Sequence, residues 1–295
     1  MRVIERVMSA LNLGCTLNEL ADLYLKYSGI HKNTRKSHGY HARHFLRLFG
    51  NRQASSLTAK ELSEFIESQK EKGLAGTTIR LRVMIWKAVL RYGYETGRIS
   101  INPGSKFKIA KPKSKRISPP TQEELKRMLD VSPDHLKRVI LLGYYLGARI
   151  GPSELFRLTW NDVDFSEKII YMPTAYKTGG NDHRPVPVHD DLIPDLLRWK
   201  QIDKDCPWVI NYKFRKINTV RHTWHRSRKL AGIERIITPY SLRHAFPTYA
   251  LCNNADLGAI CAIMGHTSSR MVLEVYQHVQ PIQLKKAVLA LPSIK

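Results

Sequence analysis

Apolar residues recur at helical spacing through most of the first hundred positions. Leu17, Leu20, Ala21, Tyr24 and Leu25 fall on one face of a helix. Three further segments repeat this pattern, and turn residues or glycines separate them. We therefore expect four helices: one that begins at 16–20 and continues through Leu25, one from Asn33 to Gly50, one from 58 to Gly73 and one over about 77–96.

Helix-start signals support these boundaries. Two pairs have the spacing of a capping box, in which the side chain of each residue bonds to the backbone N–H of the other. They are Thr16 with Glu19 and Thr58 with Glu61. Asn33 is expected to cap the second helix. The four segments together predict a compact helical domain.

Two more helices are predicted after residue 120. Thr121 and Glu124 form a third capping box. Ser132-Pro133 is expected to begin the next helix, with the proline at its favoured first position, and Gly147 to end it.

Strand patterns follow these helices. KIIYMP at 168–173 and RPVPV at 184–188 predict two short strands joined by a hairpin around TGGND, after which helical patterns resume. The predicted fold class is therefore mainly α. An N-terminal helical domain precedes a mainly-α domain with a small antiparallel β-sheet.

The sharpest break in the pattern is SKFKIAKPKSKRISPPT at 105–121, which is basic, contains prolines and lacks an apolar period. Such segments are typical of interdomain linkers. We expect a helical domain at 1–107, a basic linker at 108–120 and a second domain at 121–295.

Charge narrows the class of partner. The chain carries 48 Lys+Arg against 25 Asp+Glu, a net charge of +23, and residues 1–118 hold 23 of the basic but only 8 of the acidic residues. This balance favours a polyanionic partner, most simply nucleic acid. The basic residues are spread over several predicted helices rather than collected in one juxtamembrane block, which argues against an anionic membrane as the partner. No apolar run approaches the ~18 residues of a membrane span. The charged N-terminus makes a poor signal peptide, so a cytoplasmic protein is expected.

Several basic residues are candidates for DNA contact, although a charged face is more often only solvated. Those of the linker could follow a phosphate backbone, and those of the helices lie on predicted exposed faces. The candidates are Arg35, Lys36, Arg43, Arg47, Arg80, Lys87, Arg91, Lys111, Lys113, Lys115 and Arg116.

Neither histidines nor cysteines predict a metal site. His38, His41 and His44 recur at every third position, whereas helical metal ligands prefer a spacing of four with a carboxylate nearby. The four cysteines are widely spread without a CxxC pair, which also argues against a disulfide framework.

Five polar residues in the second half stand where chemistry could use them. In chain order they are Arg149, Lys177, Arg243, His266 and Tyr276. Each also has an ordinary structural interpretation. In the same order, these are an ion pair with Glu154, a turn lysine, a helix residue, a helix cap and a core tyrosine.

The order and wording of these segments resemble the tyrosine recombinases, the phage-integrase family. The resemblance rests on GARIGPSELFRLTWNDVDF, a hairpin lysine, YSLRHAFPTYA and MGHTSSRMVLEVYQH, with Tyr276 ten residues after His266. It covers about 140–280. The N-terminal helices and linker are similar to the family's core-binding domain only in architecture.

The resemblance implies a DNA strand-transfer site without metal or nucleotide cofactor. Arg149 and Arg243 would clamp the phosphate with bidentate donors, and His266 would bond to it. Tyr276 would attack phosphorus to give a covalent 3′-phosphotyrosyl enzyme, and Lys177 would protonate the departing 5′ oxygen.

The chain departs from the family pattern in the surroundings of this site. Tyr240 stands where the family has the histidine of HxxR, and its hydroxyl donates but is a poor base at neutral pH. The acidic residue of the first box, Glu154, follows Arg149 by five residues instead of the family's three. Glu154 and His244 are expected to support the residues that contact the phosphate. Pro247 is expected to kink or break its helix.

The expected function is that of a site-specific recombinase or integrase, prokaryotic or phage-encoded, that integrates or excises a mobile element. Its partners would be double-stranded DNA, further copies of itself in a tetramer on DNA and, in some reactions, accessory DNA-bending proteins. The tail at 284–291 is expected to dock on a neighbouring protomer. Two alternatives are a type IB topoisomerase-like enzyme and a catalytically inactive DNA-binding protein.

Overall fold

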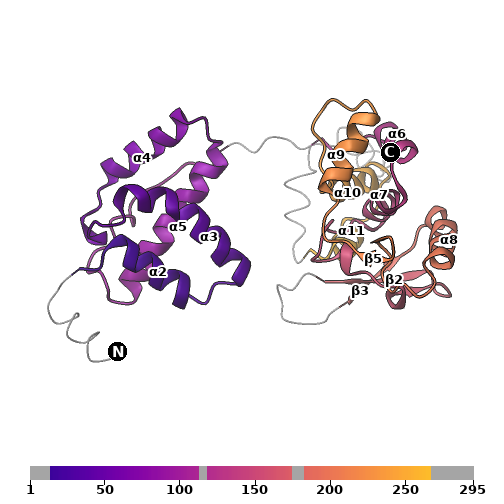
Figure 1. Cartoon of the computed structure of the whole chain (residues 1–295), viewed down its shortest axis with the longest axis horizontal. Coiled ribbons are helices and arrows are strands. Elements are labelled where there is room, and N and C mark those ends of the chain that lie inside the picture. Colours follow the sequence, from indigo (N-terminus) through magenta and orange to yellow (C-terminus); the bar gives the residue numbers. More distant parts are fainter. Residues whose placement is uncertain (1–13, 113–117, 175–182, 267–295) are drawn as a thin grey trace, which may run out of the picture. The chain divides into compact units, whose positions relative to one another are not determined.

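The computed structural model describes residues 14–112, 118–174 and 183–266. The chain divides into two compact units, Met1–Lys115 and Arg116–Lys295, each with its own hydrophobic core (Figure 1). The described residues are mainly helical with small antiparallel sheets, which confirms the predicted fold class. None of their helices is both long and apolar enough to cross a membrane.

The first unit contains the four predicted helices. They are α2 (Leu17–Tyr27), α3 (Lys32–Phe49), α4 (Ala59–Glu71) and α5 (Gly76–Glu95), with a 3-10 turn η1 (Ala54–Ser56) between α3 and α4. The capping boxes at Thr16 and Thr58 are confirmed. The predicted cap at Asn33 is wrong, because the ring of His31 accepts from the Asn33 N–H and occupies that position.

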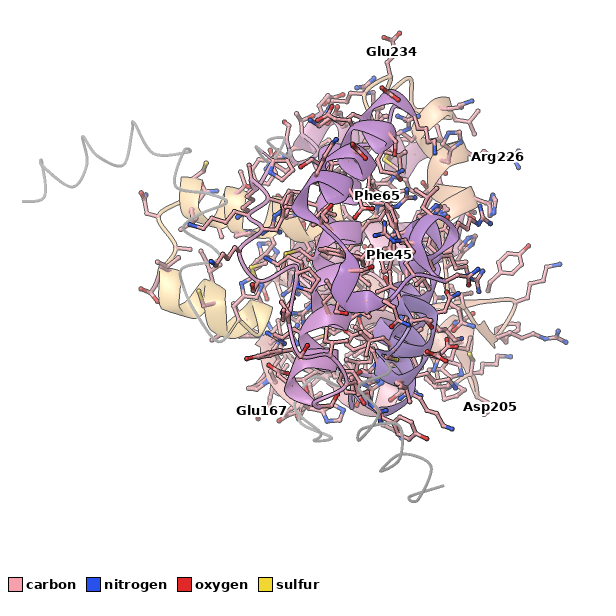
Figure 2. The ribbon with its side chains drawn as sticks, turned by 90° about the vertical axis from the view of Figure 1, so that its left-hand side faces the viewer. Phe45, Phe65, Glu167, Asp205, Arg226 and Glu234 are labelled. Carbon is pink, nitrogen blue, oxygen red and sulfur yellow. The ribbon has the colours of Figure 1, made fainter. Side chains whose placement is uncertain are left out.

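The core of this unit lies where α2, α3 and α4 meet α5. Phe45 of α3 and Phe65 of α4 point inward and are almost fully buried (Figure 2). Phe107 and Ile109 pack onto the same core, and Lys87 donates to the Phe107 carbonyl. The chain is therefore attached to the first unit well beyond the end of α5.

The second unit arranges short helices around a central one. The helices are α6 (Gln122–Val131), α7 (Asp134–Leu146), α8 (Ile193–Asp203), α9 (Arg221–Leu230), α10 (Ser241–Cys252) and α11 (Leu257–Met264), with 3-10 turns η2 (Leu155–Arg157), η3 (Trp160–Asp162) and η5 (Asp190–Leu192). The capping box at Thr121 is confirmed, whereas Pro133 is the N-cap of α7 rather than its first helical residue.

A small antiparallel sheet lies beside these helices. Its strands are β1 (Val163–Asp164), β2 (Ile169–Pro173) and β3 (His183–Pro187), in the order β1-β2-β3. Both predicted strands are present, shifted by no more than one residue. The β2–β3 register places Met172 opposite Arg184. Strands β4 (Asn211–Tyr212) and β5 (Arg215–Lys216) form a separate two-stranded hairpin.

Helix α7 is the centre of the second core, and Gly147 ends it. Gly147 has φ +56°, and a Cβ there would lie only 2.7 Å from the ring of Phe246 in α10. Both the backbone conformation and the space therefore require glycine. Helix α10 continues through Pro247 to Cys252, so the predicted break is absent.

A buried ion pair outside the sheet holds α7 to α8. Arg138 donates to both carboxylate oxygens of Asp203, at 2.6 and 3.0 Å, and to the Val209 carbonyl at 2.8 Å. We expect Arg138→Met to lower the free energy of unfolding of this unit by about 3–5 kcal/mol, because Asp203 would stay buried without its cation. Chemical denaturation measures the change. Arg198→Met, at an exposed pair, should cost about 1 kcal/mol or less, and equal losses would contradict the expectation.

Candidate active site

The loop that follows α7 brings an arginine and a carboxylate together. The backbone N–H of Arg149 donates to Oε2 of Glu154 at 2.9 Å. Nη1 of the Arg149 side chain contacts Oε1 of the same carboxylate. The Arg149 side chain is 29% exposed, whereas that of Glu154 is fully buried. The five-residue spacing therefore still allows the predicted pair, with the arginine on the outside.

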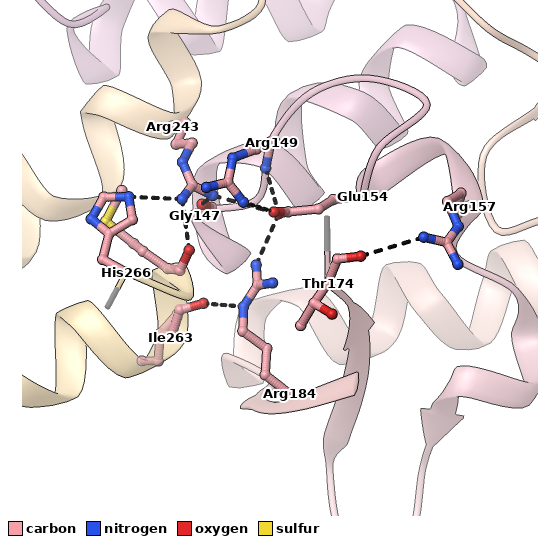
Figure 3. Close-up of polar contacts among 10 residues, drawn as sticks. Gly147, Arg149, Glu154, Arg157, Thr174, Arg184, Arg243, Ile263 and His266 are labelled. Atoms are coloured by element: carbon pink, nitrogen blue, oxygen red, sulfur yellow. Dashed lines mark hydrogen bonds and ion pairs between the residues drawn. The ribbon is translucent and has the colours of Figure 1, made fainter. Parts of the chain in front are cut away.

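Glu154 is the common acceptor of three arginines. Arg184 Nη2 lies 3.0 Å and Arg243 Nη1 3.5 Å from its Oε2, in addition to the contact with Arg149 (Figure 3). Burial by itself raises the pKa of Glu154, but the charge of Arg184, the N–H of Arg149 and the other two guanidinium charges together hold it below its ordinary value. The carboxylate is therefore ionised at neutral pH.

Arg243 reaches this cluster from the first turn of α10 and is 1% exposed. Its Nη1 donates to the Gly147 carbonyl at 2.8 Å, besides Glu154, and its Nη2 donates to the Met264 carbonyl at 2.6 Å and faces His266 Nε2 at 2.9 Å. Burial lowers the pKa of Arg243 to about 10, against the opposing effect of Glu154. The guanidinium therefore stays charged at neutral pH, with both terminal nitrogens engaged by protein.

His266 follows the left-handed residue Gly265, which ends α11. Burial first, and then the charges of Arg243 and Arg149, lower the pKa of His266 to about 4. The ring is thus neutral at pH 7. Because a guanidinium only donates, Nε2 must accept from Arg243, and the ring proton is assigned to Nδ1. Nδ1 is buried and has no hydrogen-bond partner among the described residues.

Tyr240 is the N-cap residue of α10. It is 47% exposed, and its ring meets that of His244 edge-on at 5.2 Å. It borders a hollow of about 490 Å³ that Gly151 and Pro152 of the Arg149 loop also line. Burial and then the charge of Arg243 lower the pKa of His244. Tyr240 is therefore the more accessible of these two predicted site residues.

The structure thus brings together Arg149, Glu154, Arg243 and His266. Lys177 and Tyr276 lie outside the described residues. Thr174, the last described residue before the Lys177 segment, accepts from Arg157 Nη1 at 3.4 Å (Figure 3).

Sequence reasoning missed Arg184, the third cation at Glu154. It lies in β3, whose burial alternates so that Arg184 and Val186 face inward. A cation at an inward position of a strand requires a buried partner. The alternation of Arg184 and Val186 with the prolines between them is the sequence signal for an inward-facing cation.

The predicted DNA contacts of the first unit differ in exposure. Arg35, Lys36, Arg43 and Arg47 of α3 are exposed, as are Arg91 and Lys111. Arg80 and Lys87 are half-buried, which corrects their placement on an exposed face. Lys113, Lys115 and Arg116 lie outside the described residues.

Helix α9 is a basic element that sequence reasoning also missed. Its ten residues, RHTWHRSRKL, include exposed Arg221, Arg226 and Lys229, while Trp224 faces the core. Arg226 extends outward (Figure 2). The four Lys and Arg residues in this short helix, together with the absence of any acid, were the available signal.

Two features of the cluster around Glu154 suit a phosphodiester. Three guanidinium groups surround one carboxylate, so the cluster has an excess of positive charge, and Arg149 presents part of that charge at the surface. The neutral ring of His266 adds a hydrogen-bonding group that carries no charge of its own.

Comparison with known proteins gives consistent matches. A sequence profile described as the phage integrase family matches residues 120–282. "Tyrosine recombinase XerA" of Thermococcus onnurineus is 29% identical over 277 residues, which covers 90% of this chain and 92% of the relative.

Solved structures resemble the fold. A lambda integrase (75–356) dimer bound to a COC′ core site has a TM-score of 0.75 at 22% identity, covering 87% of this chain and 97% of that one. A lambda integrase tetramer bound to a Holliday junction has a TM-score of 0.74 at 20% identity, covering 90% and 81%.

Proposed function

The chain belongs to the phage integrase family and is a tyrosine site-specific recombinase, and we propose that it cuts and rejoins duplex DNA through a covalent 3′-phosphotyrosyl intermediate on Tyr276. The observation that carries this proposal is the convergence of three arginines on buried Glu154, beside neutral His266, within the matched region. Such a cluster stabilises charge that develops on the oxygens of a phosphate.

The phosphate binds first at the surface of this cluster. Arg149 is the partly exposed cation, so its free donors meet a non-bridging oxygen directly. Arg243 is buried behind it. A phosphate oxygen gains a hydrogen bond from Arg243 Nη2 only when that nitrogen exchanges one of its present acceptors, the Met264 carbonyl or His266 Nε2.

Cleavage is a single exchange of bonds at phosphorus. Tyr276, after losing its phenolic proton to solvent, forms the bond between its oxygen and phosphorus, and the bond from phosphorus to the 5′ oxygen breaks. Lys177 gives a proton to that departing oxygen. The reverse reaction, with a 5′ hydroxyl from a second DNA as attacking group, reseals the strand. Because the phosphotyrosine linkage conserves the energy of the diester, ligation consumes no nucleotide.

Exchange between two DNAs requires several copies of the enzyme. We propose a tetramer on paired sites, since each of two duplexes must be cut on both strands, and the lambda integrase tetramer on a Holliday junction supports this arrangement. The exposed cations of α3 and α9 contact the phosphate backbone in this proposal. The proposed biological role is integration or excision of a mobile element in the cytoplasm of a prokaryotic host, with accessory DNA-bending proteins as further partners.

A trapping experiment tests the proposed chemistry. A pool of random duplexes is first enriched for sequences that the protein binds, and the best site is then rebuilt as a nicked suicide duplex. Wild-type protein should form an adduct that survives denaturation and is joined through a phosphate to the 3′ end that the cut creates, while the other fragment leaves with a free 5′ hydroxyl. A scrambled duplex is the control. Tight binding without an adduct would contradict the proposal, and relaxation of any supercoiled DNA without strand exchange would favour a topoisomerase.

Tyr240 provides a separate prediction. Tyr240→Phe should slow adduct formation about 10-fold to 100-fold, because a hydrogen bond to a charged group contributes about 1.5–3 kcal/mol, whereas Tyr240→His should keep or raise the rate. Rapid-quench measurement at saturating DNA gives both rates. Tyr212→Phe, at a similarly exposed tyrosine, is the matched control. A wild-type rate in Tyr240→Phe would assign the side chain to packing alone.

A further inference from the structure

Arg184 joins three parts of the second unit that are far apart in the sequence. It projects inward from β3 and is 9% exposed. Its Nη2 donates to Oε2 of Glu154 at 3.0 Å, and its Nε donates to the Ile263 carbonyl near the end of α11 at 2.6 Å (Figure 3). One side chain therefore links the sheet, the Arg149 loop and the last described helix.

Arg184 also packs directly on the turn that presents His266. Gly265 has φ +63°, and a Cβ at that position would lie 3.3 Å from Nη1 and 3.4 Å from Cδ of Arg184. The backbone conformation thus favours glycine, and any larger residue would also have to displace the Arg184 guanidinium by a few tenths of an ångström. Nη1 itself is buried and has no hydrogen-bond partner among the described residues.

Two arginines hold the same short turn from different sides. Arg184 binds the Ile263 carbonyl, while Arg243 binds the Met264 carbonyl and His266 Nε2. Both guanidinium groups also meet Glu154. The carboxylate, the two arginines and the 263–266 turn therefore form a closed ring of contacts.

We propose that Arg184 is a positioning residue, which fixes the 263–266 turn against Arg243 and Glu154 and so sets where His266 stands in the site. Its effect on catalysis rests on the function proposed above, whereas its effect on the turn does not. Arginine suits this role because its planar fork donates in two directions at once, to a carboxylate and to a backbone carbonyl. Lysine has one ammonium on a flexible stem and cannot hold both acceptors in the same geometry.

The expected consequence is a loss of rate rather than of DNA affinity. Arg184 is buried and makes its described contacts within the protein, so its removal leaves the exposed cations in place. A displacement of about 1 Å at a reacting group lowers rates roughly 100-fold. We expect Arg184→Met to slow adduct formation by about that factor at saturating DNA, and Arg184→Lys to slow it less.

The test compares these variants with Arg138→Lys, which alters another buried arginine of the same unit that is paired with a carboxylate. The first measurement is made on the full chain without DNA. Amide hydrogen exchange over 257–266 should be faster in Arg184→Met, and the pKa of His266, followed by NMR, should rise toward its ordinary value. Arg138→Lys should change neither. The second measurement is the rate of adduct formation on the suicide duplex, together with the affinity for the same site.

The two measurements separate the possible failures. Unchanged exchange and an unchanged His266 titration in Arg184→Met would overturn the positioning role, whatever the protein does to DNA. Changes in both, in a protein whose wild type forms no adduct, would support the positioning role and contradict the proposed function. Equal effects of Arg138→Lys and Arg184→Lys on turn and rate would also overturn the inference, because they would reflect a general loss of stability.

Discussion

Replacement of Tyr276 by phenylalanine is expected to abolish the covalent DNA adduct and leave the affinity for the site unchanged. Phenylalanine keeps the ring but lacks the oxygen that forms the bond to phosphorus, so no weaker version of the same reaction is open to it. The loss should reach the detection limit of the suicide-duplex assay. Gel-shift titration of the same duplex measures the affinity in parallel.

Tyr171→Phe is the matched control for this prediction, because Tyr171 is a partly exposed tyrosine of β2. It should form adduct at the wild-type rate. An adduct that persists in Tyr276→Phe would show that another residue is the nucleophile, and mass spectrometry of the DNA-linked peptide would identify it.

Local signals predicted the helices well, because each depends on residues within one turn. The capping boxes at Thr16, Thr58 and Thr121 need only a threonine and a glutamate three residues later, and all are present. The N-cap of α3 is His31, two residues before the predicted Asn33. His31 and Asn33 both have side chains that cap helices, and nothing in the local sequence decides between them.

Long-range contacts account for what the sequence did not predict. Lys87 was placed on an exposed face by its spacing, but the segment after α5 returns to the helix and offers it the Phe107 carbonyl. In the site, Glu154 meets Arg184 across 30 residues and Arg243 across 89. A strand period can place Arg184 on an inward face, but neither helical nor strand periods identify the partner across such distances. The motifs therefore indicated which residues act, but not that Arg243 would be buried.

Arg243→Met is expected to affect both stability and chemistry. The side chain is 1% exposed and bonds to Gly147, Met264, His266 and Glu154. Its loss removes one of the three cations that keep Glu154 ionised, and the free energy of unfolding should fall by about 3–5 kcal/mol. Adduct formation should fall about 1,000-fold or more, because a positioned donor to the developing charge is lost together with the hold on His266. Chemical denaturation and the suicide-duplex assay measure the two effects.

Arg138→Met separates these effects, because it removes an arginine of similar burial that lies outside the Glu154 cluster. Both variants should unfold at similar denaturant concentrations, yet only Arg243→Met should lose cleavage under conditions in which both are folded. Arg243→Lys adds the remaining distinction. This variant keeps the charge, but lysine cannot reach the Met264 carbonyl, His266 and Glu154 together. If Arg243 contributes only its charge, cleavage by Arg243→Lys should be nearly normal. If the fork geometry of the guanidinium is needed, the loss should be close to that of Arg243→Met. We expect the loss, and cleavage by Arg243→Lys at the wild-type rate would contradict the dependence of the site on that geometry.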